Sequence, residues 1–171
     1  VYASTSSSVT GTGCGAYESN QQAVVSIIDV SDPSGQIRRH TKFQTNGNMN
    51  DQFKMTYVYD EAAKTGTFFG IFFRSVWSSA GCSGSQYTQN SLESWDITDG
   101  EKPVLLDRLD FGKKNELVRG TAFDVSRKVA YAITAMQVDP LYAISIADPK
   151  DLQILSAVDG LSGDMSVFRL I

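Results

Sequence analysis

"GCGAYESNQQAVVSIIDVSD", at Gly13–Asp32, returns later in the chain in altered form as "GCSGSQYTQNSLESWDITD", at Gly81–Asp99. Each stretch has a cysteine among glycine and serine residues, then a tyrosine and an asparagine, and then an apolar segment that ends in Asp-x-(Ser/Thr)-Asp. The only two cysteines of the chain therefore occupy matching places in two copies of one unit. This self-similarity predicts a protein built from structural repeats.

A weaker third copy of the ending, "SIADP", occurs at Ser145–Pro149. When the copies are aligned on Asp32, Asp99 and Asp148, they lie 67 and then 49 residues apart. These spacings exceed the roughly 40–50 residues of a propeller blade, and the excess lies in the segments that contain the cysteines. Repeats of fixed order in a chain of strands favour blades arranged around an axis.

The segments between the repeats have the patterns of β-strands. "DQFKMTYVYD" at Asp51–Asp60 has apolar residues at alternate positions, and "TFFGIFFRSV" at Thr67–Val76 is nearly all apolar, as a strand buried on both faces is. Residues 6–20 are expected to form a long loop, and no segment predicts a stable helix. We therefore predict an all-β fold, a β-propeller segment of about three four-stranded antiparallel blades.

The predicted blades form a single domain over residues 1–171, with pieces at about 1–45, 51–112 and 116–160 and the start of a further blade at 163–171. Apolar positions of two inner strands are expected to form much of the core. They are Phe68, Phe69, Ile71, Phe72, Val129, Tyr131 and Ile133.

The chain begins with "VYAST" and ends with "SVFRLI", both within strand patterns, so we expect it to be part of a larger propeller. Propellers typically have about four to eight blades, so three blades are not expected to close a ring. The expected partners are the remaining blades of the same polypeptide or partner protein chains, because unpaired strand edges invite pairing.

The charge pattern argues against two classes of partner. The formal net charge is −4, and no cluster of lysine and arginine is longer than the pairs Arg38-Arg39 and Lys113-Lys114. Binding to nucleic acid or to an anionic membrane surface therefore has no electrostatic support. The longest apolar run, Phe68–Phe73, is too short to cross a bilayer, so no membrane insertion is expected.

The matching surroundings of Cys14 and Cys82 favour a disulfide between neighbouring blades, since both cysteines lie among small polar residues. The alternative is a pair of free, half-buried thiols. A disulfide would indicate an oxidising compartment.

The candidates for catalysis and metal binding are few. His40 is the only histidine, so neither a Ser-His-Asp triad nor a multi-histidine metal site can be assembled well. Asn46, Asn48 and Asn50 space side-chain oxygens as the start of a calcium loop does, but Tyr57 stands where a bidentate glutamate belongs. A plain connection between blades is the alternative, and no cofactor or metal is assigned beyond this weak calcium candidate.

The repeated Asp32, Asp99 and Asp148 lie at the starts of turns, where an aspartate side chain accepts backbone N–H groups. We interpret them as turn-capping residues rather than as paired catalytic carboxylates. No catalytic residue is assigned, and the sequence favours a protein that is not an enzyme.

Two stretches carry a resemblance to a known family: "VVSIIDVSDPSG" at Val24–Gly35 and the longer segment Arg119–Gly160, in which "QVDPLY" is the most specific part. They resemble the repeats of bacterial secreted proteins with a C-terminal β-propeller domain, which are distant relatives of tryptophan–aspartate repeat propellers. They are also similar to repeats named for a Leu-Val-Ile-Val-Asp signature. Gly100 and Ser145 depart from the expected proline and aspartate. The resemblance implies a propeller in a secreted, periplasmic or cell-surface setting and implies no catalytic residues.

The leading functional hypothesis is a non-enzymatic scaffold or binding module, secreted or at the cell surface. Tyr17, Trp77 and Tyr87 are candidate binding residues on one rim, because Tyr and Trp offer amphipathic contact area. Alternatively, these segments only cover the next blade. Two other classes stay open: an extracellular hydrolase or lyase with its site at the propeller axis, and a structural element of a surface filament or assembly.

Overall fold

The computed structural model describes residues 2–8, 17–30, 32–80, 83–135 and 139–161, which form eleven β-strands in three antiparallel sheets. Sheet A consists of β1 (Tyr2–Ser8), β2 (Tyr17–Asp29) and β3 (Arg38–Gln44). Sheet B consists of β4 (Met55–Asp60), β5 (Thr65–Ala80), β6 (Ser83–Asp96) and β7 (Val104–Phe111). Sheet C consists of β8 (Leu117–Asp124), β9 (Val129–Ala135), β10 (Asp139–Ser145) and β11 (Gln153–Leu161).

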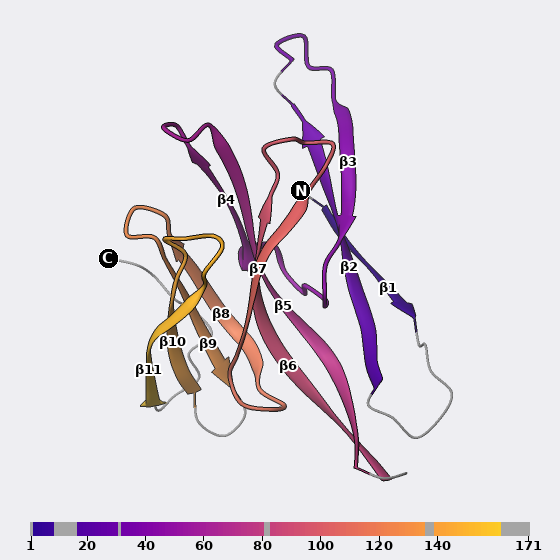
Figure 1. The fold of residues 1–171 in the computed structure, drawn as a ribbon, viewed down its shortest axis with the longest axis vertical. Helices are drawn as coiled ribbons and strands as arrows, with labels where there is room; N and C mark the ends of the chain where they lie inside the picture. Colours follow the sequence, from indigo (N-terminus) through magenta and orange to yellow (C-terminus); the bar gives the residue numbers. More distant parts are fainter. Residues whose placement is uncertain (1, 9–16, 31, 81–82, 136–138, 162–171) are drawn as a thin grey trace.

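The sheets lie side by side in chain order, from sheet A at the right of Figure 1 to sheet C at the left. One irregularity recurs in all three, where the two last strands of each sheet pair. The register shifts between Ile27 and Ile28, between Ser94 and Trp95, and between Ala143 and Ile144. Each shift begins five residues before the repeated aspartate of its sheet. The three repeats therefore share this irregularity of the backbone as well as their sequence motif. The predicted all-β fold, with three antiparallel sheets arranged as part of a β-propeller, is confirmed.

Strand β5 packs against both neighbouring sheets because its alternate residues face opposite ways. Phe68 and Phe72 belong to the core between sheets A and B, which also contains Val25, Phe43 and Trp95. Phe69 and Ile71 belong to the core between sheets B and C, where sheet C contributes mainly small and aliphatic residues such as Ala130, Ala132 and Ile144. A strand buried on both faces cannot alternate in polarity, which explains its nearly continuous apolar sequence.

Five of the seven predicted core residues are almost completely buried: Phe68, Phe69, Ile71, Phe72 and Ile133. Val129 and Tyr131 are only half-buried. In β9 the residues that pack against sheet B are the small Ala130 and Ala132, which allow the two sheets to approach closely. Val129 and Tyr131 lie on the opposite face of β9, and the prediction that these two are core residues was wrong.

The prediction of a long loop over residues 6–20 was wrong at both of its ends. Strand β1 continues to Ser8 and β2 already begins at Tyr17, while β5 and β6 pair without interruption from Thr67↔Asp96 to Ala80↔Ser83. Serine and glycine predict loops on average, but a regular antiparallel ladder satisfies the backbone of such segments equally well. These extended strands also join two sheets, since Tyr17–Ser19 of β2 pair with residues 75–77 of β5.

The expected strand at Asp51–Asp60 begins late. Gln52–Lys54 form a single 3-10 turn, in which the side chain of Asp51 accepts a hydrogen bond from the Phe53 N–H at 2.9 Å. The turn directs Lys54 inward, where it is 3% exposed. The connection from sheet A to sheet B thus delivers a charged side chain to the interior.

Candidate functional site

A groove opens between sheets B and C, at the end of the strands where the β4–β5 and β8–β9 turns lie. Its volume is about 470 Å³, within the range of pockets that bind small ligands. Residues from both sheets line it, among them Val58, Tyr59 and Thr67 from sheet B and Val125, Lys128 and Ile146 from sheet C. Because two repeats contribute one wall each, the site exists only where neighbouring sheets meet.

The groove combines apolar walls with charged groups of opposite sign. Tyr59 and Val125 are 45% and 42% exposed and offer apolar contact area. Asp60 belongs to one wall and Lys128 to the other. Hydrogen bonds from the backbone of Ala63 and Ala62, both 2.9 Å, lower the pKa of Asp60, and the Lys128 charge acts in the same direction. A ligand in the groove would therefore meet an ionised carboxylate opposite an ammonium group.

The two turns beside the groove have the same construction. Asp60 begins the first turn, and Asp124 begins the second, where it accepts from the Arg127 N–H at 2.9 Å. Each turn ends on a lysine in the left-handed region, Lys64 with φ 56° and Lys128 with φ 57°. The sequence contains the signal for this repeat, "DEAAK" and "DVSRK", but the sequence analysis did not use it. The geometry of the groove therefore follows from a second repeated motif.

The three repeated aspartates occupy equivalent positions in the turns between the last two strands of each sheet. The Oδ1 atoms of Asp32, Asp99 and Asp148 accept the backbone N–H two residues further on, at 2.8, 3.0 and 2.9 Å. Their carbonyl oxygens accept the N–H three residues further on, as in a β-turn. Hydrogen bonding also lowers the pKa of Asp32. These carboxylates are engaged by their own turns, far from one another in the chain.

The candidate calcium residues do not converge on one point. The Oδ1 atom of Asn50 accepts a hydrogen bond from the Lys54 ammonium, so a cation there would have to compete with a positive charge. The backbone N–H of Asn46 instead donates to Glu93, and the backbone of Asn48 pairs with that of Phe73. Within the described residues, no group of three or more His, Cys, Asp or Glu side chains is placed to hold a metal ion.

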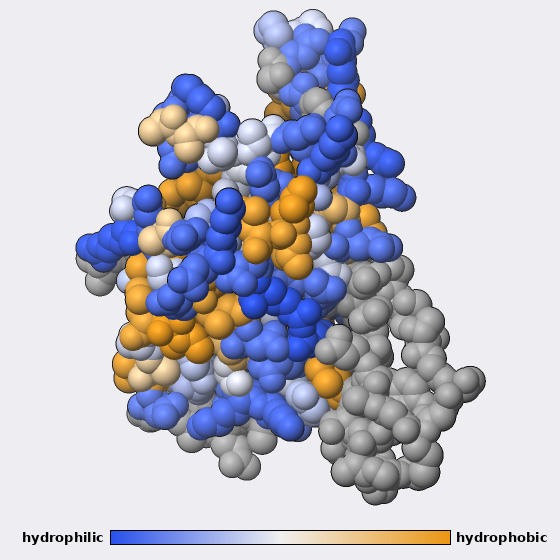
Figure 2. Space-filling view, in the orientation of Figure 1, coloured by the Kyte–Doolittle hydropathy of each residue, from blue (hydrophilic) through white to orange (hydrophobic). Residues whose placement is uncertain are grey.

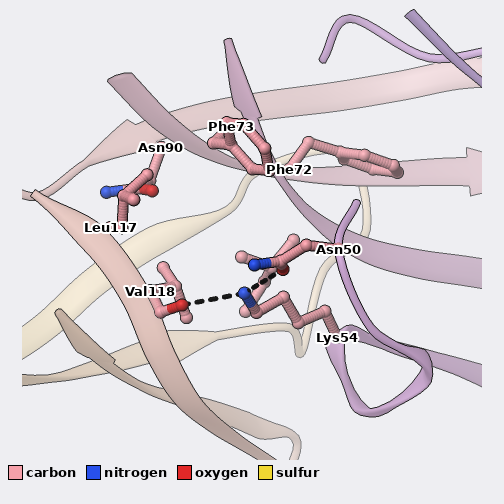
Figure 3. A pocket seen from close by; sticks show the side chains of 8 residues that line it. Asn50, Lys54, Phe72, Phe73, Asn90, Leu117 and Val118 are labelled. Atoms are coloured by element: carbon pink, nitrogen blue, oxygen red, sulfur yellow. Dashed lines mark hydrogen bonds between the residues drawn. The ribbon is translucent and has the colours of Figure 1, made fainter. Parts of the chain in front are cut away.

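Lys54 reaches from the connection after sheet A to the first strand of sheet C (Figure 3). Its Nζ donates to the Val118 carbonyl at 2.8 Å and lies 3.4 Å from an Asp51 carboxylate oxygen. Burial lowers the pKa of Lys54, and the Asp51 charge opposes this effect. The adjoining cavity, which Asn90 and Phe72 also line, measures about 10 Å³, roughly the space of one water molecule. This position suits a structural tie between sheets and has no room for a substrate.

A buried carboxylate lies in the other interface, between sheets A and B. Glu93 is completely buried and accepts hydrogen bonds from the Asn46 N–H at 3.1 Å and from Trp95 Nε1 at 3.0 Å. Burial raises the pKa of Glu93, although these bonds and the charge of Arg74 oppose the shift. The sequence analysis missed Glu93 because a glutamate in an alternating strand normally faces solvent.

The backbones of the three candidate rim residues lie near one another along the extended strands. Tyr17 of β2 is the register partner of Trp77 of β5, and Tyr87 of β6 is the partner of Val76. The Nζ atom of Lys114 lies 4.2 Å from the centroid of the half-buried Tyr87 ring, a cation–π contact. These residues therefore mark the junction of sheets A and B, and their role in binding stays a prediction.

Cys14 and Cys82 lie outside the described residues, so their disulfide also stays a prediction. The structure places His40 in β3 and describes nothing of its side chain. None of the helices in the described part of the chain has the length and apolar character that a membrane crossing needs.

Comparison with known families assigns the chain to a class. Residues 1–159 match the family model described as "Beta propeller domain", and the chain belongs to this family. No curated protein and no solved structure matches the chain.

Proposed function

We propose that this chain is a non-enzymatic scaffold and binding module, secreted, periplasmic or on the cell surface, that works together with further blades of its polypeptide or with partner chains. The observation that supports this proposal most is the groove between sheets B and C, with its apolar walls and opposed charges. The family match supports the propeller scaffold. The predicted disulfide and the resemblance to secreted repeats support the extracytoplasmic setting.

A short peptide segment fits the chemistry of the groove. The apolar contact area of Tyr59 and Val125 suits an aliphatic or aromatic side chain, and the hydroxyl-bearing Thr65 and Thr67 suit backbone hydrogen bonding. Asp60 and Lys128 provide one charge each for orientation. The volume of about 470 Å³ limits the bound segment to a few residues.

A random heptapeptide display library panned against the purified chain tests this function. The decisive variant is Val125→Arg, which fills the groove from a position that is 42% exposed and so should not disturb folding. The matched control is Val104→Arg, a change at a site on β7 that is 55% exposed and does not line the groove.

We expect enriched peptides to bind the unmodified chain and Val104→Arg equally, and Val125→Arg at least about tenfold more weakly, equivalent to about 1.4 kcal/mol. Tyr87→Ala, at the opposite end of the strands, should leave binding unchanged. A panning experiment that enriches no binding peptide would overturn the proposal, as would peptides that bind Val125→Arg undiminished.

A further inference from the structure

The outer strands of the three sheets differ in how their free edges are protected. Each sheet ends in such a strand: β3, β7 and β11. Strand β3 carries Arg38, Arg39 and Lys42, and β7 carries Asp107, Arg108 and Asp110. Charged side chains on an edge strand discourage pairing with another chain. Two of the three edges therefore have the usual protection.

Strand β11 has less of this protection. Its one charged residue, Asp159, lies toward the end of the strand, and the residues from Gln153 to Val158 include none. Three large apolar side chains on it are strongly exposed: Ile154 by 44%, Leu155 by 58% and Val158 by 51%. Figure 2 shows apolar surface at the left of the molecule, in the region where Figure 1 draws β10 and β11. An uncharged, apolar segment of this kind on a free edge is a template for strand addition.

The described strands leave one edge of β11 without a neighbouring strand. Among the described strands, β11 pairs only with β10, so one row of its backbone N–H and C=O groups has no strand partner. The neighbouring sheet packs against the face of sheet C, through residues such as Ala132 and Ile144, and not against this edge. A register shift between Ala143 and Ile144 interrupts the β10–β11 pairing and recurs in the other two sheets. A second shift, between Asp139 and Leu141, lies opposite the part of β11 that follows Val158.

We propose that β11 pairs antiparallel with β11 of a second copy of this chain, joining two four-stranded sheets across a two-fold axis. A two-fold axis brings a surface against itself, so the surface must tolerate its own charges. Copies of β3 would place Arg38 and Arg39 against the same positive charges, whereas Gln153–Val158 meets itself without like-charge repulsion. The exposed aliphatic side chains become cross-strand neighbours in the dimer and leave solvent there.

Sedimentation velocity over a series of protein concentrations tests the proposal on the intact chain. The unmodified chain should change from monomer to dimer as its concentration rises. Leu155→Lys should raise the dimer dissociation constant at least about tenfold, because two lysines then face each other near the two-fold axis. Val104→Lys, at a similarly exposed site on the edge strand of sheet B, should leave dimerisation unchanged.

A charge-pairing experiment identifies the partner surface. Leu155→Lys and Leu155→Glu should each be monomeric alone, and should form a heterodimer when mixed in equal amounts. An unmodified chain that stays monomeric at all concentrations would overturn the proposal. So would a dimer that survives Leu155→Lys, or a mixture of the two variants that does not associate. None of these outcomes depends on the groove, because Leu155 does not line it.

Discussion

The interface between sheets A and B and the interface between sheets B and C use the two faces of one strand, β5, but they are built from different chemistry. The first is aromatic, with the Phe43 ring centroid 4.5 Å from that of Trp95 and 5.8 Å from that of Phe68. The second mixes small and aliphatic residues such as Ala132 and Ile144 with fewer rings, among them Phe111, whose ring centroid lies 5.6 Å from that of Tyr142. Equivalent interfaces in a repeat protein therefore need equally close packing, but different residues can provide it.

The two interfaces also bury charge differently. The interface of sheets A and B contains the carboxylate of Glu93, held by one indole and one backbone N–H group. The interface of sheets B and C contains the ammonium of Lys54 together with Glu116, whose Oε2 accepts from Thr134 Oγ1 at 2.7 Å. A buried charge without its partners is strongly destabilising. Replacement of Glu93 should therefore affect the interface of sheets A and B, and replacement of Lys54 the interface of sheets B and C.

Truncation of one large residue in each interface should give the largest loss of stability. Phe72→Ala and Phe69→Ala each remove a ring that is 1% exposed, one from each interface. We expect each to lower the free energy of unfolding by about 3–5 kcal/mol, because both create a cavity in a packed core. Phe53→Ala, at a site that is 70% exposed, is the control and should cost less than about 0.5 kcal/mol. Urea denaturation followed by circular dichroism measures all three, and a loss below about 1 kcal/mol for either core variant would contradict the packing described.

The predicted Cys14–Cys82 disulfide would tie sheet A to sheet B and would leave sheet C untied. Its closed loop of about 68 residues should stabilise the fold by roughly 4 kcal/mol in the chain-entropy model, less any strain. Reduction should therefore lower the midpoint of unfolding. Thiol titration of the unfolded, unreduced chain should detect no free thiol, and two reactive thiols would refute the bond.

Replacement of Lys54 should affect the interface of sheets B and C. Lys54→Met keeps the length of the side chain but removes the donor to the Val118 carbonyl and to Asn50. We expect a loss of about 1–3 kcal/mol in the free energy of unfolding, the usual cost of leaving a buried polar group unpaired. Lys64→Met removes an exposed lysine and should change stability by less than about 0.5 kcal/mol. Equal effects of the two changes would show that the buried hydrogen bonds of Lys54 contribute nothing to the free energy of unfolding.

Glu93 should make the interface of sheets A and B sensitive to pH. Because the folded-state pKa of Glu93 is raised, its contribution is fully present below the unfolded pKa and is lost as pH rises through the folded pKa. The free energy of unfolding of Glu93→Gln, measured from pH 4 to pH 8, should therefore fall less with rising pH than that of the unmodified chain. Glutamine keeps the size of the side chain and cannot ionise, so the difference between the two profiles reports the carboxyl group alone. Parallel pH profiles would contradict the assignment.

Different parts of the molecule were predictable to different degrees. The repeated strand ending before Asp32, Asp99 and Asp148 was sufficient to predict the three sheets, because period and polarity decide which residues can pair and pack. The lengths of β2, β5 and β6 were not predictable, because serine and glycine disfavour strands locally while the ladder between extended neighbours overrides that preference.

The groove and the buried charges could be identified only from the three-dimensional structure. Val58 and Val125 are far apart in the sequence, and only the packing of sheet B on sheet C brings them to one groove. Lys54 and Glu93 have sequence neighbours that predict exposure, and only the connections between sheets enclose them. The "DEAAK" and "DVSRK" turns, in contrast, could have been recognised from the sequence as a second repeat.

The most direct test of the proposed groove is a crystal structure of the chain with a peptide selected from the library. We expect the peptide to lie between the β4–β5 and β8–β9 turns, with an apolar side chain against Tyr59 and Val125. Density for the peptide beside Tyr87 of β6, near the junction of β2 and β5, would instead assign binding to the rim and contradict the groove as the binding site.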